Sequence, residues 1–198
     1  MVKKLLTALV VIVSLGTAGV VCAQDFDKGM SAYDAGDYAT ALKEWTVLAE
    51  RGVAEAQHNL GRMYNNGQGV TQDYKKAVKW YRKSVEQGFA MAQSNLGMMY
   101  SKGHGVVQDN KEAVKWFHKA AAQGRAKAQS NLGVMYGNGQ GVIQDNVYAH
   151  MWFNIAASNG NTDAVKYRDS MAKRMTAADI SKAQELARAC VAKKYKGC

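Results

Sequence analysis

The sequence has 198 residues and contains no proline. Proline is the residue that most often ends or kinks a helix, so its absence removes the strongest interruptions to helical structure. Nineteen glycines remain to separate one element from the next. We therefore expect a chain of helices in which glycine marks the turns.

Long hydrophobic runs are also scarce, and the one candidate lies near Met1. Lys3 and Lys4 precede an apolar run over residues 5–13, and the small-residue site Val21-Cys22-Ala23 stands before Gln24. This order is typical of a secretory signal over residues 1–23. The run is shorter than the roughly 20 residues that span a membrane. We expect an exported protein, periplasmic or secreted, with no integral membrane segment after signal cleavage.

Cysteine occurs three times. Cys22 would leave with the signal unless it carried a lipid, as in a lipoprotein. The residues Val21 and Gly19 fit a lipid-attachment site poorly, so we favour cleavage after residue 23. Cys190 and Cys198 remain, and an even pair in an oxidising compartment predicts a disulfide rather than two free thiols.

Residues that carry catalysis are few and scattered. No two of the four histidines share a helical face with an acid between them, so the helical zinc-protease motif is absent. Ser170 and Lys173 have the Ser-x-x-Lys spacing of penicillin-recognising enzymes, but the companion Ser-Asp-Asn and Lys-Thr-Gly motifs are missing. We predict no catalytic residue, no metal site and no cofactor. The four histidines are His58, His104, His118 and His150.

Acidic residues are outnumbered by basic ones, which gives the chain a net charge of +10, two charges of which belong to the predicted signal. Such a balance favours weak attraction to anionic surfaces, although a solvated basic surface is the simpler interpretation. The stretch Lys75 to Lys83, with Trp80 and Tyr81 inside it, superficially resembles a nucleic-acid surface. An exported protein rarely meets nucleic acid, so we expect no such partner.

A 36-residue repeat dominates the rest of the sequence. The triplet Asn-Leu-Gly recurs at residues 59–61, 95–97 and 131–133. A tyrosine, a Gly-x-Gly-Val loop, an aspartate, an alanine, an aromatic residue and a closing glycine keep the same register. These positions are Tyr64, Tyr100 and Tyr136; residues 67–70, 103–106 and 139–142; Asp73, Asp109 and Asp145; Ala77, Ala113 and Ala149; Tyr81, Phe117 and Phe153; and Gly88, Gly124 and Gly160.

Each repeat is predicted to form two helices. In the middle one, residues 90–101 place Ala92, Leu96 and Met99 on one face. Gly103 can end that helix in the left-handed conformation. Asp109 can then cap a second helix over residues 110–123.

Glycines also occur inside the predicted first helices, at Gly61, Gly97 and Gly133. A glycine there costs about 1 kcal/mol relative to alanine. Its recurrence in register predicts that each one lets the second helix of its pair approach closely.

The pattern A-x-A-Q-x-N-L-G-x-M-Y-x-x-G-x-G-V-x-Q-D-x-x-x-A-V-x-W-Y resembles the Sel-1-like repeat, a branch of the tetratricopeptide-like superfamily, here in an exported bacterial member. The resemblance implies an all-α fold, an α-solenoid of antiparallel helix pairs that winds as a right-handed superhelix. Stacked units of this kind expose an extended concave face, and in this superfamily the first helix of each pair lines it.

One solenoid domain is expected over residues 24–198. It comprises an N-terminal tetratricopeptide-like cap at 24–52, repeats at 53–88, 89–124 and 125–160, and capping helices at 161–198. Thr176 and Asp179 predict a capping box, followed by a last helix over residues 177–194.

The resemblance places a partner-binding groove on the first helices, at positions that flank the Leu-Gly pair. Asn59, Asn95 and Asn131 could grip the backbone of an extended peptide, since an amide both donates and accepts hydrogen bonds. Their strict register slightly favours the alternative, in which each ties its helix to the neighbouring repeat. The predicted groove residues are Glu55, His58, Asn59, Arg62, Asn65, Met91, Ser94, Asn95, Met98, Ser101, Lys127, Ser130, Asn131 and Val134.

These features predict a scaffold that binds a protein or peptide, in envelope signalling or host contact, and not an enzyme. The alternative is a cell-wall-directed protein that resembles a penicillin-binding protein or a β-lactamase. A third hypothesis is an envelope component whose basic face rests on an anionic polymer. The sequence leaves the partner's identity and the oligomeric state open.

Overall fold

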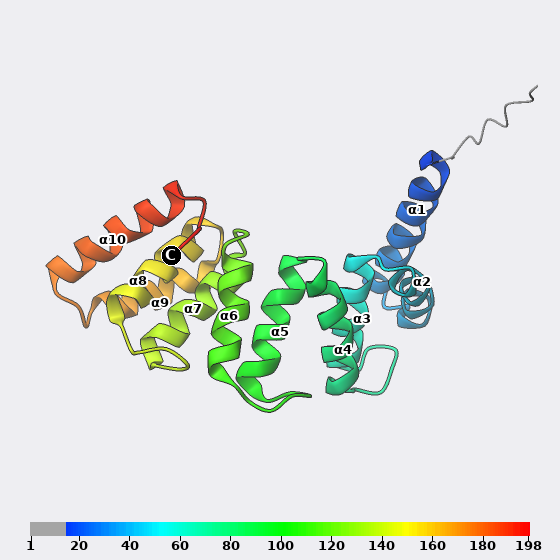
Figure 1. Cartoon of the computed structure of the whole chain (residues 1–198), viewed down its shortest axis with the longest axis horizontal. Helices are drawn as coiled ribbons and strands as arrows, with labels where there is room; N and C mark the ends of the chain where they lie inside the picture. The colour runs from blue at the N-terminus through cyan, green and yellow to red at the C-terminus, as the bar shows by residue number, and fades with distance from the viewer. Residues whose placement is uncertain (1–14) are drawn as a thin grey trace, which may run out of the picture.

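The computed structural model describes the backbone of residues 15–198 and the side chains of residues 25–198. This part of the chain consists of ten α-helices without a strand, which confirms the predicted all-α solenoid (Figure 1). The helices are α1 (Leu15–Asp34), α2 (Tyr38–Glu50), α3 (Ala54–Asn66), α4 (Tyr74–Glu86), α5 (Ala90–Lys102), α6 (Asn110–Ala121), α7 (Ala126–Asn138), α8 (Asn146–Ser158), α9 (Thr162–Ala172) and α10 (Ala177–Ala192).

The predicted signal lies largely outside the described residues. Lys3, Lys4 and the apolar run at residues 5–13 are among those not described, while the expected cleavage site falls within the backbone of α1. Over the described residues, no helix combines the length and apolar character that a membrane span requires.

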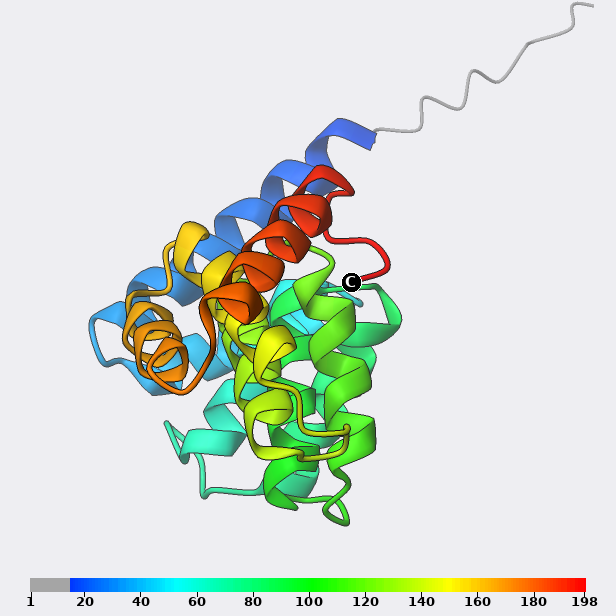
Figure 2. The same cartoon turned by 90° about the vertical axis from the view of Figure 1, so that its left-hand side faces the viewer.

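Consecutive helices pack as pairs, α1 with α2, α3 with α4, α5 with α6 and α7 with α8, and each pair then packs on the next (Figures 1 and 2). Aspartates start the second helices as predicted: the side chain of Asp109 accepts a hydrogen bond from the Glu112 amide at 2.9 Å. Gly103 ends α5 with φ of 68°. The observed bounds of α5 and α6 differ from the predicted ones by one or two residues, because Ala122 already forms the C-cap of α6.

The glycines inside the first helices confirm the predicted close approach. A Cβ atom built on Gly97 would lie 2.7 Å from the Phe117 ring of the paired helix α6. Gly61 meets Tyr81, and Gly133 meets Phe153, in the same way. Van der Waals contact between carbon atoms needs about 3.5–4.0 Å, so any side chain at these positions would push the two helices of a pair apart.

A glutamine network joins the turns of neighbouring repeats. The Gln57 amide donates to the Ala49 carbonyl at 3.0 Å, and Gln87 donates to the Gln57 side-chain oxygen at 2.9 Å. Gln123 donates to Gln93 at 2.9 Å in the next repeat. Because these glutamines at the first-helix positions are buried, each bond satisfies a polar group that would otherwise be left without a partner.

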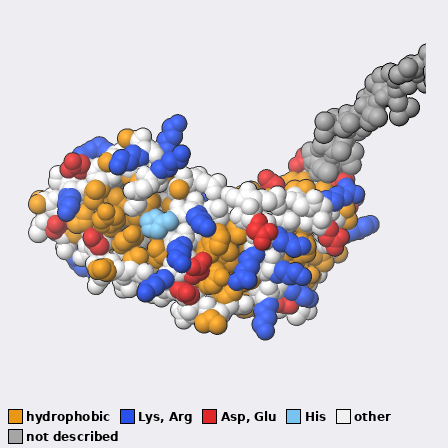
Figure 3. All heavy atoms as spheres, in the orientation of Figure 1, with side chains coloured by type: hydrophobic (Ala, Val, Ile, Leu, Met, Phe, Trp, Pro, Cys, Tyr) orange, Lys and Arg blue, Asp and Glu red, His pale blue; other side chains and the backbone are white. Residues whose placement is uncertain are grey.

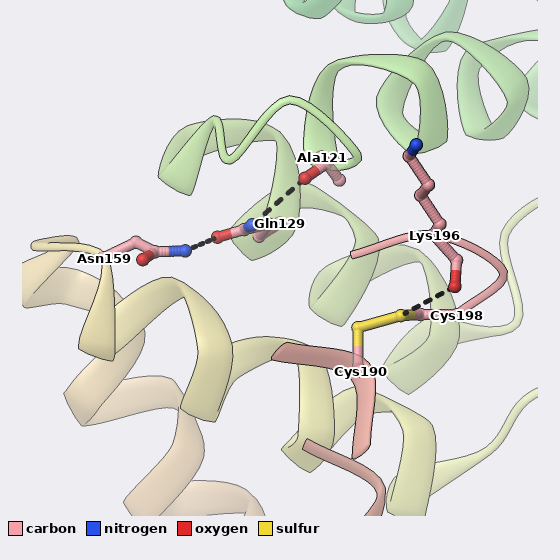
Figure 4. Close-up of a disulfide and its surroundings, with 6 residues drawn as sticks. All are labelled: Ala121, Gln129, Asn159, Cys190, Lys196 and Cys198. Atoms are coloured by element: carbon pink, nitrogen blue, oxygen red, sulfur yellow. Dashed lines mark hydrogen bonds between the residues drawn. A yellow bond between two sulfur atoms is a disulfide. The ribbon is translucent and has the colours of Figure 1, made fainter. Parts of the chain in front are cut away.

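The final copy of this network ends on the disulfide loop. Gln129 donates to the Ala121 carbonyl at 3.2 Å and accepts from Asn159 at 2.8 Å (Figure 4). Asn159 in turn accepts from the Tyr195 hydroxyl at 3.1 Å. Tyr195 lies between Cys190 and Cys198, whose predicted disulfide is present with an S–S distance of 2.04 Å. The disulfide therefore holds in place the residue that completes the last junction.

The capping helices depart from the regular stacking. The predicted box is confirmed, since Thr176 and Asp179 satisfy each other's backbone amides at the start of α10. Instead of pairing with α9, α10 packs on α8, where Met151 and Ile155 share a core with Ala187 and Cys190. The last helix ends at Ala192, two residues before its predicted end.

Candidate functional site

The predicted groove positions lie on α3, α5 and α7, the first helices of the three repeats. At the start of these helices Glu55, Met91 and Lys127 are exposed at equivalent positions. One to two turns further on, the seven side chains that remain at the surface are half-buried. They are Arg62, Asn65, Asn95, Met98, Ser101, Asn131 and Val134. These ten residues form a surface that a partner can reach, and we call it the first-helix face.

Four predicted groove residues are buried and take no part in this surface: His58, Asn59, Ser94 and Ser130. Three of them occupy the same repeat position, one residue before the asparagine of each Asn-Leu-Gly triplet. This position faces the preceding or following repeat, which the sequence pattern of a single repeat does not show.

The asparagines at the first two repeats serve the stacking of helices. Asn59 donates to the Met30 sulfur of α1 at 3.7 Å. The Asn95 amide lies 3.0 Å from Nε2 of His58, and Nδ1 of His58 lies 3.2 Å from the Asn59 side-chain oxygen. A neutral His58 with its proton on Nδ1 satisfies both contacts. These contacts support the alternative in which asparagine ties neighbouring helices.

Burial, together with the positive charge of the neighbouring Arg62 guanidinium, lowers the pKa of His58 to about 4. The hydrogen bond from Asn95 acts in the same direction, because a protonated ring has no acceptor to offer the amide. His58 is therefore neutral at physiological pH and serves as a structural link between α3 and α5.

Asn131, in the third repeat, has no such partner. Its amide nitrogen is buried without a hydrogen bond among the described residues. At the junction between α5 and α7, Ser94 takes the position that His58 has between α3 and α5. Phe117 likewise takes the position of Tyr81. Neither short serine nor apolar phenylalanine replaces the imidazole acceptor, so the same asparagine is satisfied at one junction and unsatisfied at the next.

A hollow of about 380 Å³ opens between α3 and α5. Asn65 and Met98 from the predicted groove line it, together with Lys102 and His104. The His104 ring stacks on Tyr74 with ring centroids 4.3 Å apart. The lining thus combines an apolar methionine, amides and one lysine, and it contains no carboxylate.

A second hollow, of about 290 Å³, occupies the equivalent place between α7 and α9. Val134 and the backbone of Gly133 form one side, and Tyr167 and Met171 form the other. Arg174 stands where Lys102 stands in the first hollow. The sequence pattern placed these α9 residues in the capping helices and not in the groove, although they continue the 36-residue register: Tyr167 follows Asn131 by 36 positions, and Arg174 follows Asn138.

Ser170, of the Ser-x-x-Lys motif, also lines this second hollow, while Lys173 forms the C-cap of α9 and is exposed. A lysine that activates a serine is usually desolvated, and Lys173 lacks that burial. Within the described residues, no cluster of three or more histidine, cysteine, aspartate or glutamate side chains has the arrangement of a metal site.

The model of the Sel1 repeat matches residues 54–89, 90–124 and 126–161, which together make up more than half of the chain. The chain belongs to the Sel1 repeat family. A Sel1 repeat protein from Oxalobacter formigenes is similar in structure, with a TM-score of 0.65 and 31% identity over 83% of this chain and 75% of that one. No curated protein matches the chain.

A second similar structure is c5321, a protective antigen present in uropathogenic Escherichia coli strains that displays an SLR fold. Its TM-score is 0.62 and its identity 29%, over 88% of this chain. This chain spans 46% of the antigen's length. Sel1 repeat proteins are typically non-catalytic scaffolds for protein–protein interaction.

Proposed function

We propose that this chain is an exported, non-catalytic scaffold that binds an extended segment of a partner protein along its first-helix face. The observation that carries the proposal is the recurrence of hollows at equivalent junctions, α3 with α5 and α7 with α9. Each offers an apolar side chain, Met98 or Val134, beside a cation. A peptide that places side chains in both hollows, which lie two repeats apart, fits a solenoid whose repeats present related surfaces.

Export is supported by two features that do not depend on the groove. The sequence over residues 1–23 has the order of a secretory signal. The disulfide between Cys190 and Cys198 joins residues that would stay reduced in a cytosol but oxidise in an exported compartment. The natural form for binding experiments is accordingly the protein recovered from the periplasm, with N-terminal sequencing expected to begin at Gln24.

Selection of peptides from a displayed library against this recovered protein tests the binding proposal. Met98→Glu and Val134→Glu should each weaken the binding of the selected peptides at least tenfold, because a carboxylate would replace the apolar contact and would pair with the neighbouring cation that the peptide otherwise meets. Val47→Glu is the matched control, since Val47 is an exposed valine on the second helix α2.

Titration calorimetry gives the dissociation constants, and circular dichroism checks that each variant is folded. If wild type and the three variants bound the peptides with equal affinity, the peptides would bind elsewhere and the proposal would be overturned. Failure to select any peptide above background would overturn it as well.

A further inference from the structure

The second helices α4 and α6 carry lysines in matching rows. Lys75, Lys79 and Lys83 are spaced four residues apart on α4, and Lys111, Lys115 and Lys119 repeat them 36 residues later on α6. Four residues of helix rise about 6 Å, so each row places three ammonium groups along one face. We call these six residues the lysine ladder.

A hollow of about 370 Å³ runs beside the first row. Lys75, Lys79, Arg82 and Lys83 line it, and Glu86 is its single carboxylate. The remaining lining is Val78 and the Gly105–Val106 turn of the following repeat. The view in Figure 3 shows lysine and arginine side chains gathered over the half of the molecule that contains α3 to α6.

Tryptophans hold the end of each row in place. The Lys83 ammonium lies 4.6 Å from the centroid of the Trp80 ring, and that of Lys119 lies 4.1 Å from the Trp116 ring. Cation–π contacts of this kind fix a flexible side chain while leaving its charge available. Among the side chains that the structure describes, the single salt bridge of the ladder joins Lys115 to Glu112 at 2.9 Å.

The ladder is confined to two repeats. In α8 the equivalent positions are Val147, Met151 and Ile155, and α10 packs on the last two. In α2 they are Ala39, Lys43 and Val47. The open ladder therefore has defined ends, one of which is set by the helix that covers α8.

We propose that the lysine ladder binds a linear polyanion whose charged groups are carboxylates or phosphates and which carries no aromatic bases. Lysine is a compact point charge that suits either group. Single-stranded nucleic acids are held largely by base stacking on aromatic residues. The lining of the hollow contains none, and the two tryptophans beside the ladder are already engaged by Lys83 and Lys119. Its floor has only Val78 and Val106 as apolar side chains, too little to seat the apolar anchors of a peptide.

Binding of polygalacturonate and of inorganic polyphosphate to the full mature chain tests the proposal and separates a carboxylate from a phosphate ligand. The ladder variant carries Lys→Gln at 75, 79, 111 and 115. The matched control carries Lys→Gln at 166, 173, 182 and 193, which are exposed lysines of α9 and the C-terminal segment. Both variants lose four positive charges, so any difference between them reports position and not net charge.

At 50 mM salt the ladder variant should bind at least tenfold more weakly than wild type, and the control within threefold. Lys→Arg at the four ladder positions should retain binding, because the charge is kept. Wild-type affinity should fall steeply with salt, as counterions released from the polymer are regained, and the slope should be shallower in the ladder variant.

Equal losses in the ladder and control variants would mean nonspecific attraction and would overturn the proposal. Binding to vesicles with anionic headgroups, but to neither polymer, would overturn it in favour of a membrane surface. Because Met98→Glu lies on a different face, it should leave polymer binding unchanged even if the peptide proposal fails.

Discussion

The outer faces of α4 and α8 show how one repeat position can be used in two ways. Lys79 in α4 is exposed to solvent, whereas its equivalent in α8, Met151, is 2% exposed beneath α10. The last position of the row changes from Lys83 to Ile155, which is 1% exposed. Replacing lysine by an apolar residue thus creates the seat for a capping helix, and the repeats that keep lysine remain open.

The largest expected effect comes from restoring the lysine in α8. Met151→Lys would bury an ammonium group without a partner, and such a change destabilises a protein by about 3–5 kcal/mol. Denaturant unfolding measures this loss, and hydrogen exchange should show α10 losing protection first. The reverse change, Lys79→Met, lies on the exposed row and should alter stability by less than about 0.5 kcal/mol. Similar effects of the two changes would contradict the proposed role of α10 as a cover.

Most of the regular architecture was predictable because it depends on contacts within one repeat. Gly97 against Phe117, and Asp109 as a helix cap, follow from spacing alone. The seat of α10 was not predicted, although its signal was present: Val147, Met151 and Ile155 interrupt a lysine register that could have been compared across repeats. Contacts between elements distant in the fold are fixed by shape, which a local pattern does not contain.

The candidate site was predicted only in outline. The register located the first-helix face and Met98 within it, but it also included His58, Ser94 and Ser130, which are buried. Whether such a position is buried depends on the helix stacked against it. The α9 side of the second hollow, with Tyr167, was not predicted as part of the site, because the segment after the third repeat was assigned to the cap while it also lines the hollow.

The junctions on either side of α5 provide a second comparison. His58 is buried between α3 and α5, whereas Ser94 takes its place between α5 and α7. The pKa of His58 is lowered to about 4 by burial, so the unfolded chain, with a histidine pKa of about 6.5, binds the proton more readily. Burying His58 in its neutral form therefore contributes stability that is fully present above about pH 6.5 and is lost as the pH falls towards 4.

We therefore expect His58→Ser to reduce the acid sensitivity of the fold. His58 should account for about 2 kcal/mol of the stability that wild type loses between pH 7 and pH 5. Burial also lowers the pKa values of His118 and His150, so part of the loss should persist in the variant. The control is His104→Gln, which installs the residue found at the equivalent loop positions of the other repeats. If His58→Ser lost as much unfolding free energy between pH 7 and pH 5 as wild type does, this assignment would be refuted.

The smallest expected effect concerns the asparagines. Replacing them should change the stability of the fold with opposite signs at two equivalent residues. Asn95→Leu would remove the donor to His58 and leave a buried ring nitrogen without a partner, a loss of about 1–2 kcal/mol. Asn131→Leu would instead remove a buried amide that has no hydrogen bond. Replacing an unsatisfied polar group by an apolar one of similar size should be neutral or stabilise by about 1 kcal/mol.

Thermal and denaturant unfolding of the two variants, measured side by side at pH 7, decide between a structural and a binding role for the series. If Asn131 is structural, Asn131→Leu keeps or raises stability and leaves peptide affinity unchanged. If stability is kept but affinity falls at least tenfold, Asn131 takes part in binding, and its amide must turn out of its buried position to reach the partner's backbone. The third repeat would then bind with the same residue that the second repeat uses for stacking.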